Sequence, residues 1–220
     1  MIFTNVSKYF TKNHKDSRLW AGYETSLDPY SHFLTTLLDP KNGKLVLDDG
    51  CGNGRFSIAM ARNGAKVLAL DLSKSLLKRA SKTIKQQKLQ DLIDLVQGDV
   101  QNLPFKEGVF DRLLCAHNLW YIPNYEAAVA EMFRTLKSEG KLVADHLNLL
   151  NLGVLWSQCF YILSRVARRN PTPVFYRTPK QILQPFAAFR TEIFGLALSR
   201  KQTIEGKKTL TPRLIVRVSR

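Results

Sequence analysis

A glycine-rich turn, set between a short apolar run and a helical pattern, constrains the fold of this chain more than any other stretch. The apolar residues at positions 45–47 predict a buried strand, and two acids end it. Gly50, Gly52 and Gly54 follow at alternate positions, where a backbone without Cβ atoms can adopt positive φ angles and approach a ligand closely. A helical pattern begins at Arg55. This order predicts a nucleotide-sized site at the carboxyl end of the strand, facing the N–H groups at the start of the helix.

Strands and helices alternate through the rest of the chain with short connections. We expect further strands at 65–70, 94–97, 110–116 and 141–144, with a turn at 138–140 before the last of them. Helices are expected at 31–38, 73–87, 124–136, 149–166 and 178–189, and two closing strands at 192–198 and 214–218. This alternation favours an α/β fold with a doubly wound, mostly parallel sheet.

Length and composition indicate a globular protein with one domain. The chain has 220 residues, of which 45% are hydrophobic, and three widely spaced cysteines. An odd number of scattered cysteines argues against a disulfide framework and for a reducing compartment. No metal-binding cysteine or histidine pattern, signal-peptide core or long apolar run is present, so we expect no metal, no membrane span and a cytoplasmic location.

The positive charge is concentrated in the last third of the chain. The net charge is +15; residues 1–147 carry 20 Lys and Arg against 16 Asp and Glu, and residues 148–220 carry 13 against 2. Such a basic region fits an anionic substrate, nucleic acid or an anionic membrane surface, and it is equally compatible with ordinary solvated surface charge.

The glycine turn fits two kinds of nucleotide cofactor to different degrees. A dinucleotide fingerprint requires a further glycine where this chain has Arg55, whereas Asp71 is placed to hold a ribose in either case. Four acids are expected at the carboxyl ends of adjacent strands: Asp48, Asp49, Asp71 and Asp99. Such a set favours a cationic ligand with few phosphates and would repel a pyrophosphate.

Five ordered segments resemble the class I S-adenosylmethionine-dependent methyltransferases. They are VLDDGCGNGRFS (46–57), LALDLS (68–73), GDVQNLPF (98–105), FDRLLCAHNLWYIPN (110–124) and FRTLKSEGKLV (133–143). The resemblance implies a seven-stranded Rossmann-like sheet with an antiparallel last strand, and S-adenosyl-L-methionine as cofactor.

The same resemblance implies a role for each matching position. Asp48 would orient the methionyl amino end, and the turn Gly50, Cys51, Gly52, Asn53 and Gly54 would wrap it. Asp71 would bind the ribose hydroxyls. The remaining contacts would come from Leu72, Asp99 and Val100 around the adenine, and from Cys115 and Ala116 near the methionyl side. Asp49 departs from the family, which usually has an apolar or small residue there.

Methyl transfer needs a base only when the acceptor must lose a proton. Two histidines follow expected strands at the mouth of the site: His117 is the first candidate base and His146 the second. Each could instead serve hydrogen bonding or positioning. Trp120 and Tyr121 are candidate acceptor-pocket residues, although aromatic core packing explains them equally well.

Two specialised chemistries are disfavoured. Enzymes that methylate exocyclic amines of nucleic acids resemble one another in a Pro-Pro-aromatic block, where this chain reads His117-Asn118-Leu119-Trp120. Pyrimidine carbon-5 enzymes use a cysteine next to proline, and Cys115 lacks that neighbour, so we expect Cys115 to be a small buried residue.

The expected division of the single domain is an N-terminal helical flap (1–42), a cofactor-binding core (43–146), a substrate cap (147–177) and a closing unit (178–220). The cap is apolar, with Trp156 and Phe160 as candidate pocket residues near three arginines. It could be a lid over a lipophilic acceptor, a helix lying on an anionic membrane, or a plain helix packed on the sheet.

The leading hypothesis is a methyltransferase acting on a small, hydrophobic or aromatic molecule, with peripheral membrane contact as a further option. RNA methylation is the second reading, favoured by charge but without an RNA-binding motif. The third is a regulatory protein that binds S-adenosylmethionine without catalysis.

Overall fold

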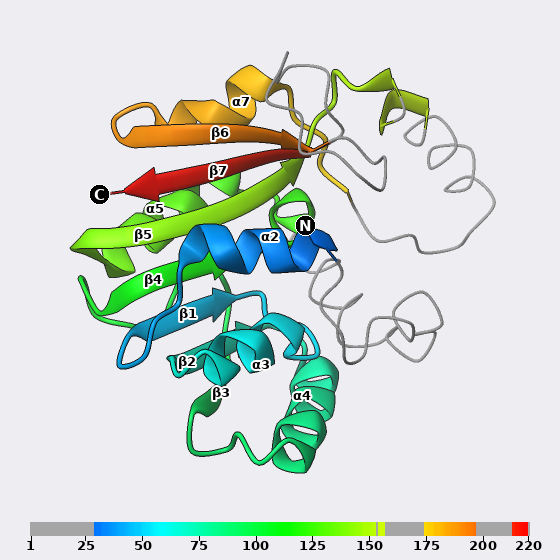
Figure 1. Ribbon diagram of the computed structural model, residues 1–220. Coiled ribbons are helices and arrows are strands. Elements are labelled where there is room, and N and C mark those ends of the chain that lie inside the picture. Colours follow the sequence, from blue (N-terminus) through cyan, green and yellow to red (C-terminus); the bar gives the residue numbers. More distant parts are fainter. Residues whose placement is uncertain (1–28, 153, 157–173, 197–212, 220) are drawn as a thin grey trace.

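The computed structural model describes residues 29–152, 154–156, 174–196 and 213–219 (Figure 1). Its elements, in chain order, are α2 (Pro29–Leu38), β1 (Leu45–Asp49), α3 (Arg55–Arg62), β2 (Lys66–Asp71), α4 (Lys74–Gln86), β3 (Ile93–Gln97), β4 (Phe110–Cys115), the 3-10 helix η3 (Leu119–Tyr121), α5 (Tyr125–Thr135), β5 (Leu136–Leu147), α7 (Pro179–Leu183), the 3-10 helix η4 (Gln184–Phe186), β6 (Arg190–Leu196) and β7 (Arg213–Ser219).

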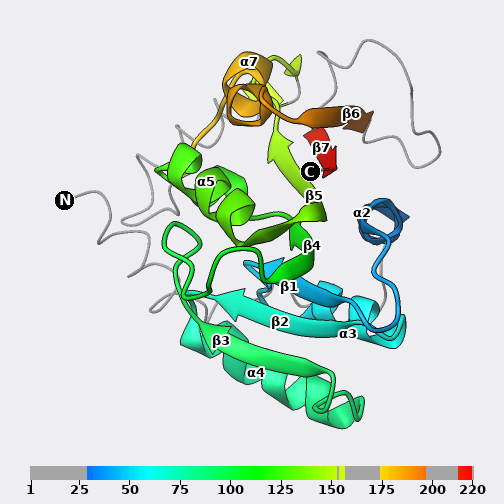
Figure 2. The ribbon, with the colours of Figure 1, turned by 90° about the vertical axis from the view of Figure 1, so that its left-hand side faces the viewer.

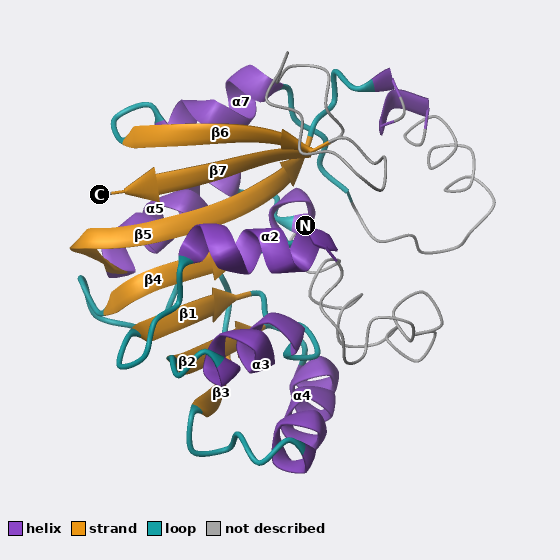
Figure 3. Cartoon of the chain, viewed as in Figure 1, coloured by secondary structure: helices purple, strands orange, loops and turns teal. Residues whose placement is uncertain are grey.

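The seven strands form one sheet in the order β3-β2-β1-β4-β5-β7-β6. β1 to β5 pair in parallel, and β7 is antiparallel to both β5 and β6. The carboxyl ends of β1, β4 and β5 therefore meet at one edge, where their arrowheads point in Figure 3. The predicted α/β sheet, mostly parallel with an antiparallel last strand, is confirmed.

Helices cover both faces of the sheet (Figure 2). α2, α3 and α4 bury their apolar residues on one face, in a cluster with Val46, Val67 and Val143. α5, η3 and η4 cover the other face, in a cluster with Leu47, Leu70 and Leu142. Neighbouring residues of one strand thus enter different cores, because side chains alternate across a strand.

Side-chain caps fix where two of the helices begin. Ser73 accepts a hydrogen bond from the backbone N–H of Leu76 at the start of α4, and Asn124 accepts one from Ala127 at the start of α5. Serine and asparagine are preferred at this position because they satisfy N–H groups that have no partner within the helix. The helices predicted over 73–87 and 124–136 begin at these caps.

The turn predicted at 138–140 is wrong, because β5 already begins at Leu136, directly after α5. Leu136 pairs with Phe110, and the register then shifts so that Arg112 pairs with Lys141. The three intervening residues 137–139 are exposed, and Gly140 returns close under Leu136, where a Cβ would lie 2.5 Å from the leucine side chain. The chain thus makes a bulge within one strand.

The helix predicted over 178–189 is shorter than expected. It begins as predicted at Thr178, whose side chain forms a capping box with Gln181. It then tightens into the 3-10 turn Gln184–Phe186. Pro185 explains the change, because proline lacks the N–H that a continuing α-helix needs.

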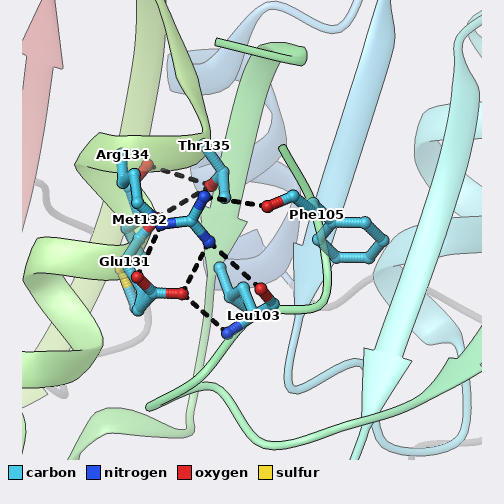
Figure 4. Close-up of polar contacts among 6 residues, drawn as sticks. All are labelled: Leu103, Phe105, Glu131, Met132, Arg134 and Thr135. Carbon is cyan, nitrogen blue, oxygen red and sulfur yellow. Dashed lines mark hydrogen bonds and ion pairs between the residues drawn. The ribbon is translucent and has the colours of Figure 1, made fainter. Parts of the chain in front are cut away.

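A salt-bridged cluster ties the loop after β3 to α5 (Figure 4). Glu131 accepts a hydrogen bond from the backbone N–H of Leu103 at 2.8 Å, and Arg134 donates to the carbonyls of Phe105 and Leu103 at 2.8 and 3.1 Å. Arg134 also bonds both oxygens of Glu131, and these bonds lower the pKa of the glutamate. The cluster fixes the middle of the loop that carries Asp99 near its start.

Several predicted features lie wholly or partly outside the described residues. They include the first 28 residues of the flap, Phe160 and most of the helix predicted over 149–166, of which residues 152 and 154–156 are helical. The four-part division of the domain stays a prediction. Within the described ranges, no helix is long and apolar enough to cross a membrane.

Candidate functional site

The glycine turn connects β1 to α3 in the conformation that its sequence predicts. Gly50, Gly52 and Gly54 have φ angles of 83°, 58° and 83°. The backbone N–H groups of Gly50 and Cys51 both donate to the carbonyl of Leu70, at 2.9 and 2.8 Å, so β2 anchors the turn. A Cβ placed on Gly52 would meet nothing within 4 Å, which leaves open space beside the middle of the turn.

Asp71 fastens the end of β2 to the same turn. One of its carboxylate oxygens accepts the N–H of Gly52 at 2.8 Å, and the other accepts the N–H of Ser73 at 2.7 Å. Burial raises the pKa of Asp71, and the two backbone donors oppose that shift. The residue therefore shapes the turn in addition to any contact with a ligand.

Asp48 points from the end of β1 toward α3. Its carboxylate accepts a hydrogen bond from the hydroxyl of Ser57 at 2.5 Å. Burial raises the pKa of Asp48 to about 7, although the bond from Ser57 lowers it. A cation brought beside Asp48 would favour its charged form and find a strong partner there.

Asp49 is enclosed on the opposite side of β1. Its side chain is 0% exposed, and in the described part of the chain neither carboxyl oxygen has a hydrogen-bond partner. Burial raises its pKa well above the usual range, and the neighbouring Asp48, Asp71 and Asp99 add to the shift. The expectation that Asp49 lies at an open mouth with the other acids is therefore wrong, because side chains alternate along β1 and Asp49 faces the opposite side of the sheet from Asp48.

The other predicted cofactor residues surround the turn. Asp99, two residues beyond β3, is half-buried and accepts hydrogen bonds from the backbone and side chain of Gln101. Leu72 and Asn53 are half-buried; Cys51, Val100, Cys115 and Ala116 are buried. The structure thus brings the residues of β1, β2, β3 and β4 together at one edge of the sheet, and the prediction that Cys115 is buried is confirmed.

The loop after β4 lies against the glycine turn and carries His117. Asn118 donates to the backbone carbonyl of Asp49 at 3.5 Å, and a Cβ on Gly50 would come within 2.2 Å of the Asn118 amide nitrogen. His117 has a φ angle of 60°, uncommon for a residue with a Cβ, and its N–H donates to Asp145 at 2.6 Å. The ring of Phe56 packs edge-on against the His117 imidazole.

His117 belongs to a cluster of polar side chains. Its Nε2 lies 3.1 Å from Nη1 of Arg213, which also donates to Asp145 at 3.2 Å. The Arg213 guanidinium lies over the ring of Trp120, 5.2 Å from its centroid. The candidate base is thus held by an acid from β5 and an arginine from β7.

His146 lies in a closed environment. Its Nδ1 is 2.8 Å from the carbonyl oxygen of Leu147, and its Nε2 is 3.1 Å from Nη1 of Arg177. Burial lowers the pKa of His146 to about 4. Because an arginine can only donate, Nε2 accepts and Nδ1 carries the proton, so we assign His146 to holding structure together rather than to acting as a base.

Arg177, the last residue of the cap, binds the cap to the loop after β4. It donates to the carbonyls of Ile122 and Pro123 at 2.9 and 3.3 Å, and its guanidinium lies over the ring of Tyr125. The N–H of Phe175 donates to the Trp120 carbonyl at 2.7 Å. The two ends of the cap meet where Asn148 and Arg177 form a bridge.

The predicted acceptor-pocket residues differ in their surroundings. Trp120 is buried, with 4% of its surface exposed, and packs against His117 and His146. Tyr121 is half-buried beside it. Trp156 is 79% exposed, so its ring is open to solvent rather than enclosed in a pocket.

Sequence reasoning missed Ser57, Asp145, Arg177 and Arg213. Asp145 directly precedes His146 at the end of a predicted strand, so the rule that selected the acids of other strands could have found it. The two arginines carried no such signal, because the histidines that they contact, His146 and His117, lie 31 and 96 residues away in the sequence.

Comparisons with known proteins agree with this arrangement. A family profile described as a methyltransferase domain matches residues 47–144. The demethylmenaquinone methyltransferase of Lactobacillus johnsonii is 35% identical over 108 residues, which are 48% of this chain and 44% of the relative. The ubiquinone biosynthesis O-methyltransferase of Psychrobacter arcticus is 39% identical over 107 residues, 48% of this chain and 42% of the relative. The chain thus matches less than half the length of these relatives.

Similarity to solved structures extends over most of the chain. One such structure is geranyl diphosphate C-methyltransferase from Streptomyces coelicolor A3(2), in complex with S-adenosyl-L-homocysteine. The match covers 87% of this chain and 76% of the chain of that enzyme. The TM-score is 0.66 at 15% sequence identity, so the likeness shows the fold.

Proposed function

We propose that the chain is a class I S-adenosylmethionine-dependent methyltransferase and that it transfers a methyl group to a small lipophilic acceptor of the quinone or isoprenoid kind. The names of the relatives support this acceptor class. No observation on the site favours RNA or a non-catalytic role over it.

The cofactor is S-adenosylmethionine, which carries its methyl group on a positively charged sulfonium sulfur. When the methyl group is transferred, the rest of the cofactor leaves as a neutral thioether. The residues present fit it: the turn is open beside Gly52, and the carboxylates of Asp48, Asp71 and Asp99 lie at the ends of adjacent strands. This set of acids around an open glycine turn is the observation that carries the proposal, because it suits a cation and repels a pyrophosphate.

The cofactor proposal predicts a large effect of Asp71→Ala. The substitution removes a carboxylate that holds the N–H of Gly52 and that would bind the ribose. Charged hydrogen bonds contribute about 1.5–3 kcal/mol each, so we expect the Kd for S-adenosylmethionine in calorimetry to rise about 100-fold. Asp91→Ala, at an exposed acid between α4 and β3, is the matched control. Equal affinities of both variants and the wild type would remove the cofactor assignment.

The acceptor class is tested with labelled cofactor. Protein and cofactor are incubated with an extract of the source organism that has been separated into lipid, small-molecule and RNA fractions. We expect label in the lipid or small-molecule fraction, and label confined to RNA would contradict the proposal.

We further propose that the cap reaches its acceptor at an anionic membrane surface. Four large apolar side chains are exposed at its start: Leu150 (47%), Leu152 (80%), Leu155 (36%) and Trp156 (79%). No acid occurs from position 146 to 191, whereas six basic residues do. Apolar side chains beside positive charge are the combination that binds anionic lipid interfaces.

The membrane proposal predicts weaker vesicle binding by Leu152→Glu and Trp156→Glu. Burying one such side chain contributes about 1.5–3 kcal/mol, so each variant should partition at least about tenfold less onto phosphatidylglycerol vesicles in co-sedimentation. Gln90→Glu adds the same charge at the exposed turn before β3 and should bind like the wild type. Identical binding by all four proteins would overturn the membrane contact.

A further inference from the structure

The contact between His117 and Arg213 places a hydrogen-bond donor and an acceptor side by side. His117 Nε2 and Arg213 Nη1 are 3.1 Å apart. A guanidinium has N–H donors and no acceptor, so the imidazole nitrogen must be the acceptor. The His117 imidazole is therefore neutral, with its proton on Nδ1 and none on Nε2.

Three neighbouring strands fix this pair at the carboxyl edge of the sheet. His117 follows β4, Asp145 lies near the end of β5, and Arg213 begins β7 opposite Leu147. Asp145 accepts from the backbone of His117 and from Arg213, and its side chain is 0% exposed. The buried carboxylate thus positions both partners and holds the left-handed backbone at His117.

The pair faces solvent in part, and it adjoins the cofactor turn. The side chains of His117 and Arg213 are 18% and 22% exposed, in contrast to the enclosed Asp145. Asn118, the next residue after His117, packs against Gly50. A small molecule that approached the cofactor from this side would meet His117 and Arg213 together.

We propose that His117 and Arg213 form a receptor for an acidic hydroxyl group of the acceptor, a phenol or an enol. This inference rests on the proposed methyltransferase function and specifies the atom that is methylated. A hydroxyl both donates and accepts, so on entering the pair it donates to His117 Nε2 and accepts from Arg213. One hydrogen bond between the two side chains is replaced by two bonds to the ligand.

The same arrangement supports proton removal. As the O–H bond breaks, the proton passes to His117 Nε2, and the electron pair left on oxygen forms the bond to the transferred methyl carbon. The carbon–sulfur bond breaks with its electrons remaining on sulfur. Arg213 stabilises the negative charge that develops on oxygen, and Asp145, 3.9 Å from His117 Nε2, faces the imidazolium that forms.

An amine is a poorer match for this receptor. A hydroxyl oxygen has more than one lone pair. One lone pair can therefore accept the hydrogen bond from Arg213 while another electron pair of the oxygen forms the new bond to carbon. An amine nitrogen has one lone pair, so a hydrogen bond from Arg213 would occupy the electrons needed for attack. The pair therefore selects for O–H acceptors over N–H acceptors of the same shape.

The selectivity is tested with two acceptors that differ in one group, a hydroxynaphthoquinone and the corresponding aminonaphthoquinone. We expect methylation of the hydroxyl compound, and a loss of about 10–100-fold in kcat/KM for Arg213→Met, the range of one charged hydrogen bond. Arg213→Lys should recover part of this loss. Arg217→Met, on the same face of β7 but paired with Glu192, is the matched control and should retain activity.

A second measurement needs no turnover. The chain has four histidines, so nitrogen-15 NMR of the imidazoles can be assigned with single His→Gln variants. His117 should show protonated Nδ1 in the wild type, and its Nε2 signal should shift on adding the hydroxyl compound but not the amine. An Nε2-protonated His117, preferred methylation of the amine, or wild-type rates in Arg213→Met would overturn this inference. Absence of methylation with every acceptor, with the NMR shifts intact, would instead contradict the proposed function.

Discussion

Alanine at Gly50 is expected to destabilise the protein by about 2–5 kcal/mol in denaturant unfolding. The φ angle of 83° costs an L-residue about 1–2 kcal/mol, and forced overpacking adds about 1–3 kcal/mol. The new Cβ would lie 2.2 Å from the amide nitrogen and 2.9 Å from the Cβ of Asn118. Rotating the amide cannot relieve the second contact, so the loop that carries His117 has to move.

Gly52→Ala should separate stability from binding. Its φ angle of 58° imposes a similar conformational cost of about 1–2 kcal/mol, but nothing lies within 4 Å of the new Cβ. The methyl group would instead occupy the open side of the turn, where the cofactor approaches. A misfit of about 1–3 kcal/mol there should weaken S-adenosylmethionine binding by about 5–150-fold in calorimetry.

Gly43→Ala is the matched control for both variants. Gly43 has a φ angle of 74° and no neighbour within 4 Å of a Cβ, and it precedes β1 at the opposite edge of the sheet. The Gly43→Ala variant should lose about as much stability as Gly52→Ala and should bind the cofactor with wild-type affinity. Normal binding by Gly52→Ala would show that the open side of the turn is not the cofactor's side.

The parts of the fold that sequence predicted are those set by local chemistry. Ser73 and Asn124 mark helix starts because a cap needs only its own helix, and the glycines of the turn mark positive φ angles without any distant partner. The bulge before Gly140 depended instead on how Leu136 pairs with Phe110 on another strand. The turn predicted there followed from composition alone, which contains no information about register.

The residues of the candidate site divide in the same way, into those that local sequence predicts and those that depend on distant partners. The acids that follow strands could be grouped because parallel strands end at one edge, and so Asp48, Asp71 and Asp99 were found. The contact between His117 and Arg213 joins residues 96 positions apart through an antiparallel strand, and a single sequence gives no reason to pair them. Asp49 shows the limit of grouping by position, because adjacent residues of a strand face opposite sides.

Asp49 is the site at which a single substitution should stabilise the protein. Its carboxyl group is fully buried without a hydrogen-bond partner among the described residues, and its pKa is raised well above 3.8. Asp49 in the folded protein therefore keeps its proton to a higher pH than Asp49 in the unfolded chain does. Asp49→Asn keeps the size of the side chain and removes the ionisation.

The sign of the pH dependence follows from that difference. A raised pKa means that the folded state binds the proton more tightly, so the contribution of Asp49 is fully present below pH 3.8 and is lost as the pH rises toward the folded pKa. Each pH unit in this window lowers the free energy of unfolding by up to about 1.4 kcal/mol. The raised pKa values of Asp48 and Asp71 act in the same direction and remain in the variant.

Urea unfolding of the wild type and Asp49→Asn, at about pH 5 and about pH 8, measures the effect. The stability advantage of the variant should be larger at the higher pH, because only the wild type must retain a proton at Asp49 as the pH rises. Asp94→Asn, at an exposed acid of β3, controls for the change in net charge and should show no such growth. A constant difference between wild type and Asp49→Asn would mean that Asp49 is charged in the folded protein, and a buried carboxylate could then persist only with a partner in the rest of the chain.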